Sequence, residues 1–323
     1  MLRLGLCCKF YKEPIRFRTS TARYLKGFSR AVRIEKISQL CLANAGALLN
    51  AIKYCGRNNI GCFRVNSQIL PLKTHPDIGY ALTDLPDWQG INNLFSQCHD
   101  ASSKLNVRLS FHPDQFVLLS SANTDIVKNS IKELDYQAEV SELIGADVIN
   151  IHGGGAYGDK ASALRRVGIT FLRLSKRVRA RLTLENDDRV YTPADLFPFC
   201  KEYGIPLAYD VHHHRCLPDK LSVAQATQHA LTTWNREPLF HISSPKHGWS
   251  KDQASRHHDY IDVKDFPAEW RKLDITVEVE AKAKELAVQK LYKGLKLSRH
   301  KIKQASDAGR NSAKSYFTQR KTG

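Results

Sequence analysis

The sequence predicts an α/β protein folded as a single (β/α)8 TIM barrel. Three observations lead to this prediction. Short apolar runs rich in β-branched residues alternate with longer amphipathic stretches, about eight such units can be counted, and they fill roughly the first 290 residues of the chain. Eight units in this length fit one closed barrel better than two unrelated domains. We therefore expect one barrel domain over residues 1–293, with a metal cluster at the carboxyl ends of its strands, and a basic tail over residues 294–323.

The expected strands are the short runs of apolar and β-branched residues. They are residues 3–8, 60–66, 107–112, 148–152, 182–185, 207–211, 239–242 and 275–280. The expected helices are the amphipathic stretches between them, residues 34–54, 91–105, 125–144, 161–176, 192–203, 221–231 and 281–291. Two helix starts carry capping signals, because Thr192 precedes Pro193 and Ser222 offers a hydroxyl group to the helix that follows it.

The chain carries a strong positive charge, with 49 Lys and Arg against 32 Asp and Glu and a formal net charge of +17. Such a charge attracts polyanions, nucleic acid above all, although a merely basic solvated surface is the alternative. Residues 13–33 read as a basic loop that follows the first strand on the catalytic face. The tail from Lys296 is expected to be a mobile basic arm or, equally well, a disordered segment that aids solubility.

Cysteine usage and the N-terminal segment bear on the compartment. The eight cysteines are scattered and form no Cys-x-x-Cys pair, which is typical of a reducing cytosol. The first apolar run meets Lys9 before a signal-peptide core could form, and no apolar run approaches about 18 residues. We expect a soluble cytoplasmic protein, nucleoid-associated if bacterial, with no membrane contact and no obligate protein partner.

Side chains that can bind metals follow most of the expected strands. They are His112, His152, Glu185, Asp210, His213, His241 and Glu280. The carboxyl ends of barrel strands converge on one mouth, where active sites of this fold are built. A single histidine at a strand end is more often a hydrogen-bonded structural residue, but six of the eight strands supply such a group. Crowded carboxylates repel one another unless cations neutralise them, so the pattern predicts a metal centre. Mixed imidazole and carboxylate ligands fit Mn²⁺ or Zn²⁺ better than Mg²⁺ or Ca²⁺, and the sequence leaves manganese and zinc both open.

Two local motifs extend this set. Asp210 and His213 form an Asp-x-x-His run whose side chains can serve neighbouring metals, while His212 and His214 are expected to be bystanders. Residues 257–260, His-His-Asp-Tyr, offer a second imidazole and carboxylate pair in the loop after the seventh strand. A polar loop without a metal is the alternative for that segment.

Seven short segments, in matching order within residues 1–293, together resemble the UV damage endonuclease family. They are 63–67 (Phe-Arg-Val-Asn-Ser), 111–116 (Phe-His-Pro-Asp-Gln-Phe), 150–155 (Asn-Ile-His-Gly-Gly-Gly), 184–187 (Leu-Glu-Asn-Asp), 210–213 (Asp-Val-His-His), 241–245 (His-Ile-Ser-Ser-Pro) and 279–282 (Val-Glu-Ala-Lys). That family belongs to a superfamily of barrels that includes endonuclease IV and xylose isomerase. The basic tail lies outside the resemblance.

The resemblance implies a cluster of up to three divalent ions, with manganese favoured and zinc or cobalt as alternatives. The first ion would be held by His112, His152 and Glu185. Glu185 would bridge to a second, completed by Asp210, His241 and Glu280. The third would be held by His213, His257 and Asp259, with His258 an adjacent rival of His257. The residues expected to carry catalysis are Glu185, Asp210, His241 and Glu280.

The resemblance also implies the reaction and the substrate. The enzyme would be a monomer that cuts damaged double-stranded DNA 5′ to pyrimidine dimers, 6-4 photoproducts and abasic sites, leaving a 3′-hydroxyl group. Gln115 and Phe116 match the pair that the family inserts into the duplex at the lesion. Asn66 and Ser67 lie in a matching motif and are expected to contact DNA there.

Three positions depart from the family. Phe116 stands where the family often has tyrosine, Leu6 where some relatives have a tyrosine that probes the lesion, and Leu239 where some relatives carry a lysine, reported as carboxylated, near the metals. Two other functions remain open: a metal-dependent sugar isomerase on the same barrel, and a nucleic-acid-binding protein without catalysis. The isomerase leaves the positive charge unexplained, and the binding protein leaves the ligand set idle.

Overall fold

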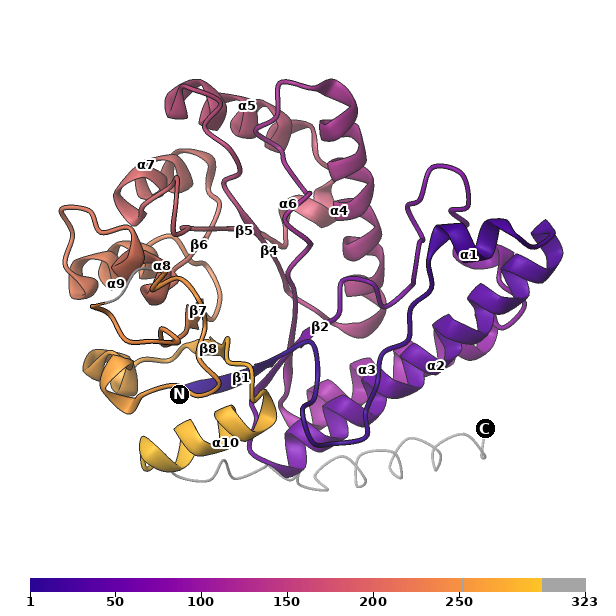
Figure 1. Cartoon of the computed structure of the whole chain (residues 1–323), viewed down its shortest axis with the longest axis horizontal. Coiled ribbons are helices and arrows are strands. Elements are labelled where there is room, and N and C mark those ends of the chain that lie inside the picture. The colour runs from indigo at the N-terminus through magenta and orange to yellow at the C-terminus, as the bar shows by residue number, and fades with distance from the viewer. Residues whose placement is uncertain (251–252, 298–323) are drawn as a thin grey trace, which may run out of the picture.

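Eight parallel strands form the wall of a barrel in the computed structural model, which describes residues 1–250 and 253–297 (Figure 1). The strands are β1 (Arg3–Cys7), β2 (Cys62–Val65), β3 (Arg108–Phe111), β4 (Val148–His152), β5 (Leu182–Glu185), β6 (Leu207–Ala208), β7 (Leu239–Ile242) and β8 (Thr276–Val279). They lie in the order β6-β5-β4-β3-β2-β1-β8-β7. A parallel bridge between Asp210 and His241 joins the two ends of this order and closes the ring. The (β/α)8 barrel prediction is confirmed.

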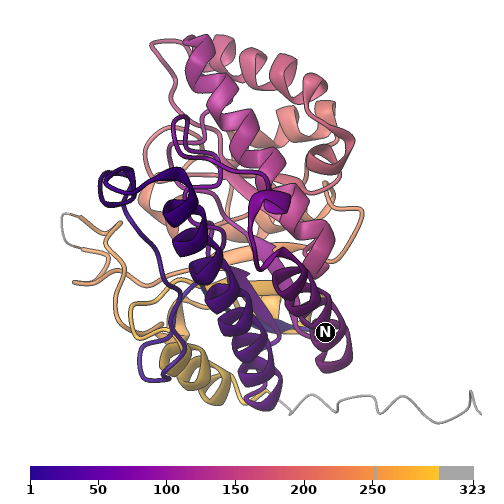
Figure 2. The same ribbon diagram turned by 90° about the vertical axis from the view of Figure 1, so that its right-hand side faces the viewer.

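Helices follow the strands and cover the outside of the barrel. They are α1 (Ala22–Lys26), α2 (Arg30–Arg57), α3 (Trp88–Leu105), α4 (Thr124–Ile144), α5 (Lys160–Arg173), α6 (Lys176–Arg179), α7 (Pro193–Tyr203), α8 (Val211–Cys216), α9 (Val223–Leu231) and α10 (Glu285–Gly294). Short 3-10 helices span Leu82–Asp84, Val263–Asp265 and Ala268–Lys272. In the second view the long helices α2, α3 and α4 lie in front of the strands (Figure 2). Every strand is buried along nearly its whole length because helices cover the outer face and side chains fill the interior.

Two predicted elements are shorter than expected. The strand predicted at 207–211 ends at Ala208, because the Asp210 carboxylate accepts the backbone N–H of His213 at 2.8 Å and starts α8. The helix predicted at 161–176 breaks at Leu174, whose backbone is extended, and resumes as α6. Local capping and backbone geometry override the amphipathic pattern at both places.

The predicted basic loop at 13–33 is wrong in part, since it contains α1 and the first residues of α2. Thr21 accepts the backbone N–H of Tyr24, and Ser29 accepts that of Val32, so two hydroxyl caps make the segment helical. The last helix begins later than predicted because Lys284 has a positive φ of 49°, which a helix does not allow.

The chain stays packed against the barrel after α10 ends. Leu295 is buried, and Leu297 packs against the core. Residues 298–323, with most of the predicted basic arm, lie outside the described residues. Among the described helices, none has both the length and the apolar character that crossing a membrane requires.

Helix α7 offers a direct test of capping in this barrel. Thr192 Oγ1 accepts the N–H of Asp195 at 3.3 Å, and the Asp195 carboxylate accepts the N–H of Thr192 at 2.9 Å, which forms a capping box. We expect Thr192→Ala to lower the free energy of unfolding by about 1 kcal/mol, measured by urea denaturation. Thr192→Ser keeps the acceptor and serves as the control. An alanine variant as stable as the serine variant would contradict the role of the cap.

Candidate metal centre

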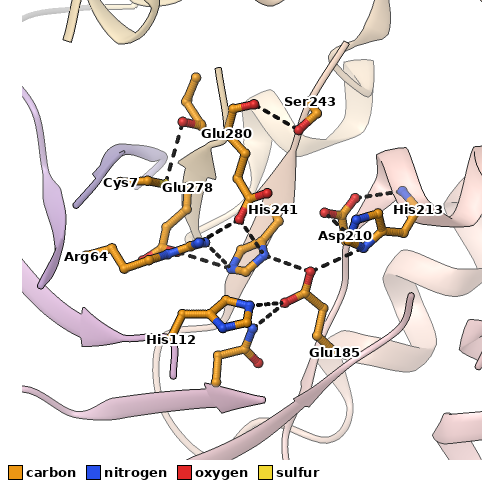
Figure 3. Close-up of polar contacts among 12 residues, drawn as sticks. Cys7, Arg64, His112, Glu185, Asp210, His213, His241, Ser243, Glu278 and Glu280 are labelled. Atoms are coloured by element: carbon orange, nitrogen blue, oxygen red, sulfur yellow. Dashed lines mark hydrogen bonds and ion pairs between the residues drawn. The ribbon is translucent and has the colours of Figure 1, made fainter. Parts of the chain in front are cut away.

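Side chains from six strands or strand ends converge inside the carboxyl end of the barrel (Figure 3). Residues two apart on a strand point to the same side, so each strand can place two side chains in the barrel interior. The central cluster consists of His112, His152, Glu185, Asp210, His213, His241 and Glu280. The floor beneath it consists of Arg64, Ser110, Asn150, Thr183 and Glu278. The structure thus brings together all seven strand-end residues that the sequence singled out.

Glu185 lies at the middle of the central cluster and is 1% exposed. One carboxylate oxygen, Oε2, is 3.0 Å from Nε2 of His112 and accepts a hydrogen bond from the Asn150 amide. The other, Oε1, lies 3.0 Å from Nδ1 of His241 and 3.3 Å from Nδ1 of His213. The Asn150 side chain is in turn bound by the hydroxyl group of Thr183, another residue of the floor. Glu185 is therefore held so that its two oxygens face two different sets of imidazoles.

Asp210 is held just as firmly, and it is fully buried. Asn186 accepts the N–H of Asp210 and donates to its carbonyl group, each at 2.9 Å. Oδ1 is used in capping α8, whereas Oδ2 lies 3.4 Å from Nδ1 of His213. Oδ1 thus stabilises the start of α8, and Oδ2 faces the central cluster.

Several buried ligand atoms find no hydrogen-bond partner among the described residues. They include His152 Nδ1, Glu185 Oε1, Asp210 Oδ2 and His241 Nδ1. Glu185 Oε1 and His241 Nδ1 face each other at 3.0 Å as an ion pair, but neither atom makes a hydrogen bond of good geometry. Leaving a buried polar atom without such a bond costs on the order of 1–3 kcal/mol, so this concentration of atoms favours a ligand. Two groups have ligand atoms within 4.8 Å of one another: His112 with His152 and Glu185, and Glu185 with Asp210 and His213. Mixed nitrogen and oxygen donors of this kind fit a divalent transition metal.

The pKa values of the cluster residues favour ionised carboxylates with positive charge beside them. Burial alone would raise the pKa of Glu185, but the surrounding imidazoles, His241 and His152 foremost, together outweigh burial and hold that pKa well below its usual value. Burial lowers the pKa of His152, which favours the neutral imidazole that binds metals. Burial opposes protonation of His241, yet the carboxylates of Glu185 and Glu278 together raise its pKa to about 10. Protons on imidazole therefore balance the charge of the buried carboxylates.

The loop after β7 supplies one further imidazole to this region. His257 Nδ1 lies 3.8 Å from Oε2 of Glu280, and its ring centroid is 6.4 Å from that of His213. His258 turns the other way, and its Nδ1 accepts the N–H of Tyr260 at 3.0 Å. Asp259 is exposed. The structure therefore favours His257 over His258 and leaves Asp259 outside both groups of potential ligands found in the described part of the chain.

The residues expected at the lesion lie in the loops beside the cluster. Gln115 and Phe116 follow β3, and Phe116 is 73% exposed, which is unusual for an aromatic side chain. Asn66 follows β2, and its Oδ1 accepts the N–H of Gln68. Ser67 and Phe116 line one pocket of about 530 Å³. The two loops thus present an exposed apolar side chain next to a hollow.

The residues of the floor were not predicted from the sequence to belong to the site. Arg64 lies in one of the matching motifs but received no role, and Glu278 lies two residues before Glu280. Arg64 bonds Oε2 of Glu278 through Nε at 2.5 Å and Oε1 of Glu280 through Nη1 at 2.6 Å. Burial opposes ionisation of Glu278, but Arg64, together with His241 and Ser110, overcomes burial and lowers the pKa of Glu278 to about 2. A charged residue inside a buried strand was the signal available in the sequence, since such a residue requires a partner.

Two of the three residues that depart from the family are leucines of the barrel strands. Leu6 and Leu239 are both fully buried in the barrel wall. Neither leucine adds a polar group to the centre, so the central cluster is built without a side chain from either position.

Comparison with known sequences places the chain in a family. A model of the family described as UV-endonuclease UvdE matches residues 2–310. A UV DNA damage endonuclease of Bacillus velezensis is 34% identical over 287 residues, which cover 85% of this chain and 87% of that protein. One from Bacillus cereus is 32% identical over 304 residues, covering 90% of this chain and 92% of that protein.

Solved structures give a concordant result. The crystal structure of SacUVDE matches with a TM-score of 0.81 and 26% identity, covering 92% of this chain and 98% of the other. Endonuclease IV from Thermus thermophilus matches with a TM-score of 0.59 and 14% identity, covering 91% and 97%, and so shares the fold. Because the family model spans nearly the whole chain and the Bacillus relatives cover more than four fifths of it, the protein belongs to the UV-endonuclease UvdE family.

Proposed function

We propose that the protein is a DNA repair endonuclease that depends on divalent metal ions and hydrolyses the phosphodiester bond 5′ to UV photoproducts and abasic sites. The photoproducts are pyrimidine dimers and 6-4 photoproducts, and the cut leaves a 3′-hydroxyl group. The observation that carries the proposal is the convergence of buried, unpartnered imidazole and carboxylate atoms at the barrel mouth of a UvdE-family chain. The net charge of +17 favours a polyanionic substrate over a sugar.

The ligand groups suggest how up to three ions would be held. His112, His152 and Glu185 would hold the first. Glu185, Asp210, His241 and Glu280 would hold the second. His213, with His257 and Asp259, would hold the third, although His213 lies nearer to Glu185 and Asp210 than to His257. Manganese is favoured, and zinc or cobalt would suit the same donors.

Divalent ions in this centre would supply hydroxide near neutral pH and neutralise the charge that develops on the phosphate. The chain's own part is positioning. Glu185 orients its two oxygens toward the two ligand groups, and Asp210 and Glu280 add carboxylates that are fixed by Asn186 and Arg64. No protein nucleophile is required.

A basic groove leads out of the centre and would bind the DNA backbone. Glu280 and His257 lie at its inner end beside the buried Arg64, and its other cationic lining residues are Lys9, Lys246, Arg256, Lys282 and Lys284. Such side chains bind phosphates without reading sequence. The groove therefore supports a path for one DNA strand beside the bond that is cut.

Selectivity for damage would come from deformability. A dimer or an abasic site is already partly unstacked, so inserting Gln115 and Phe116 costs less there than in intact duplex. Phe116 retains the stacking face of an aromatic ring. Asn66 and Ser67, in the neighbouring loop, would contact the DNA next to this wedge.

Removing the metal tests the chemistry. With Mn²⁺ present the protein should nick UV-irradiated plasmid, a chelator should abolish nicking, and Glu185→Gln should lower the rate at least about 100-fold because it removes the shared ligand. Glu142→Gln changes a partly exposed carboxylate on α4 and is the matched control. Nicking that persists in chelator would contradict metal dependence. Interconversion of aldose and ketose would select the isomerase, and binding without cutting would select the non-catalytic protein.

Lesion recognition is tested by replacing the wedge. The double variant Gln115→Ala/Phe116→Ala should reduce the ratio of damaged to intact DNA cut about tenfold, since stacking on an aromatic side chain is worth about 1–3 kcal/mol per base. Its metal content should stay at the wild-type level. Leu172→Ala, which removes a 61% exposed apolar side chain from α5, is the control. Equal losses on damaged and intact DNA would exclude a role in discrimination.

The basic groove predicts a change in salt dependence. In Lys246→Gln/Lys282→Gln, the slope of log K against log salt should become shallower by about 0.9 for each phosphate that the protein no longer neutralises. Binding should weaken alike on different sequences. Lys53→Gln/Lys104→Gln carries the same charge change on α2 and α3, at the amino ends of the strands. If both double variants show the same slope, the groove does not hold the backbone.

A further inference from the structure

We infer that Glu278, held by Arg64, is a positioning residue that selects the metal-binding tautomer of His241. The inference rests on the proposed metal centre and concerns the floor below it. His241 and Glu278 are neighbours on adjacent strands, paired in the register of β7 and β8. Both side chains are buried, at 0% and 1% exposure, so water does not compete for their polar atoms.

The two nitrogens of His241 face different environments (Figure 3). Nδ1 points into the central cluster, 3.0 Å from Oε1 of Glu185 and 3.6 Å from Oε1 of Glu280. Nε2 points into the floor, 3.1 Å from Oε2 of Glu278 and 3.0 Å from Nη2 of Arg64. A metal held with Glu185 and Glu280 would therefore bind Nδ1 and leave Nε2 to the floor.

The floor offers Nε2 two opposite partners. The Arg64 guanidinium can only donate, so a bond from Arg64 makes Nε2 the acceptor and leaves the proton on Nδ1, where it blocks a metal. The Glu278 carboxylate can only accept, so it draws the proton to Nε2 and frees the lone pair of Nδ1. Glu278 thus supplies the carboxylate that orients a metal-binding histidine through its second nitrogen.

Arg64 keeps this carboxylate in place and charged. Its Nε binds Oε2 of Glu278, and its Nη1 binds Oε1 of Glu280, so one guanidinium spans the floor and the cluster. Ser110 donates to Oε1 of Glu278, which fixes the other side of the carboxylate. With Oε1 of Glu278 bound by Ser110, Oε2 faces Arg64 and His241.

The test is the isosteric variant Glu278→Gln, read out by metal binding rather than by cutting. Free Mn²⁺ is followed by electron paramagnetic resonance during titration of the protein. We expect one equivalent of Mn²⁺ to bind about 10–100-fold more weakly, the range found when the hydrogen-bond partner of a metal-binding histidine is lost. The remaining equivalents should keep their affinity.

Asp219→Asn is the matched control. Asp219 accepts from Nε2 of the buried His214 at 3.0 Å, so the same carboxylate-to-amide change is made on a histidine outside the central cluster. It should leave Mn²⁺ affinity unchanged even if its melting temperature falls as far as that of Glu278→Gln. A Glu278→Gln protein that binds Mn²⁺ with wild-type affinity and stoichiometry would overturn the inference. A wild-type protein that binds no Mn²⁺ would instead overturn the proposed function.

A second measurement does not need the Glu278→Gln protein. In the zinc-loaded wild-type protein, ¹⁵N nuclear magnetic resonance reports which imidazole nitrogen of His241 carries hydrogen, with the signal assigned by its absence from His241→Asn. We expect the hydrogen on Nε2 and the metal on Nδ1. A hydrogen on Nδ1 would contradict the selection by Glu278.

Discussion

Four carboxylates buried in one barrel interior need positive charge close by, and this need organises the structure. Glu185, Asp210, Glu278 and Glu280 lie within reach of one another or of shared partners, and three of them are at most 1% exposed. Taking such groups out of water is costly unless they are paired. Arg64 supplies a permanent cation that bonds two of them, Glu278 and Glu280. Histidine protons or divalent ions must supply the rest, and for this reason the centre has the character of a metal site.

The polar side chains of the barrel interior form two layers, the central cluster and the floor beneath it. The central cluster faces the mouth and offers unpartnered atoms to a ligand, whereas the side chains of the floor mostly bind one another. From below, Asn150 donates a hydrogen bond to Glu185 and is itself bound by Thr183. Arg64 binds Glu280 from the same side. A rigid layer beneath the ligands holds them in productive geometry, which loops alone do less well.

The sequence was most informative where strand alternation and barrel geometry act together. The end of a parallel barrel strand faces the mouth whatever the rest of the chain does, so His112, His152, Glu185 and Glu280 could be located from the residues alone. Arg64 and Glu278 could not be given roles, because Arg64 lies 177 residues from His241 and 214 residues from Glu278 in sequence, and only the barrel register brings the three together. The division of 13–33 into loop and helix depended on two hydroxyl caps, a local signal that a strong charge pattern concealed.

The ring of strands closes through residues of the site itself. β6 has two residues, and an isolated bridge between Asp210 and His241 joins its end of the sheet to β7. Two side chains of the cluster therefore flank the narrowest seam of the wall. An ion shared by Asp210 and His241 would act there as a clasp, and its binding energy would add to the stability of the folded chain by mass action. Binding of such an ion would therefore reinforce a seam that the backbone bridge already closes.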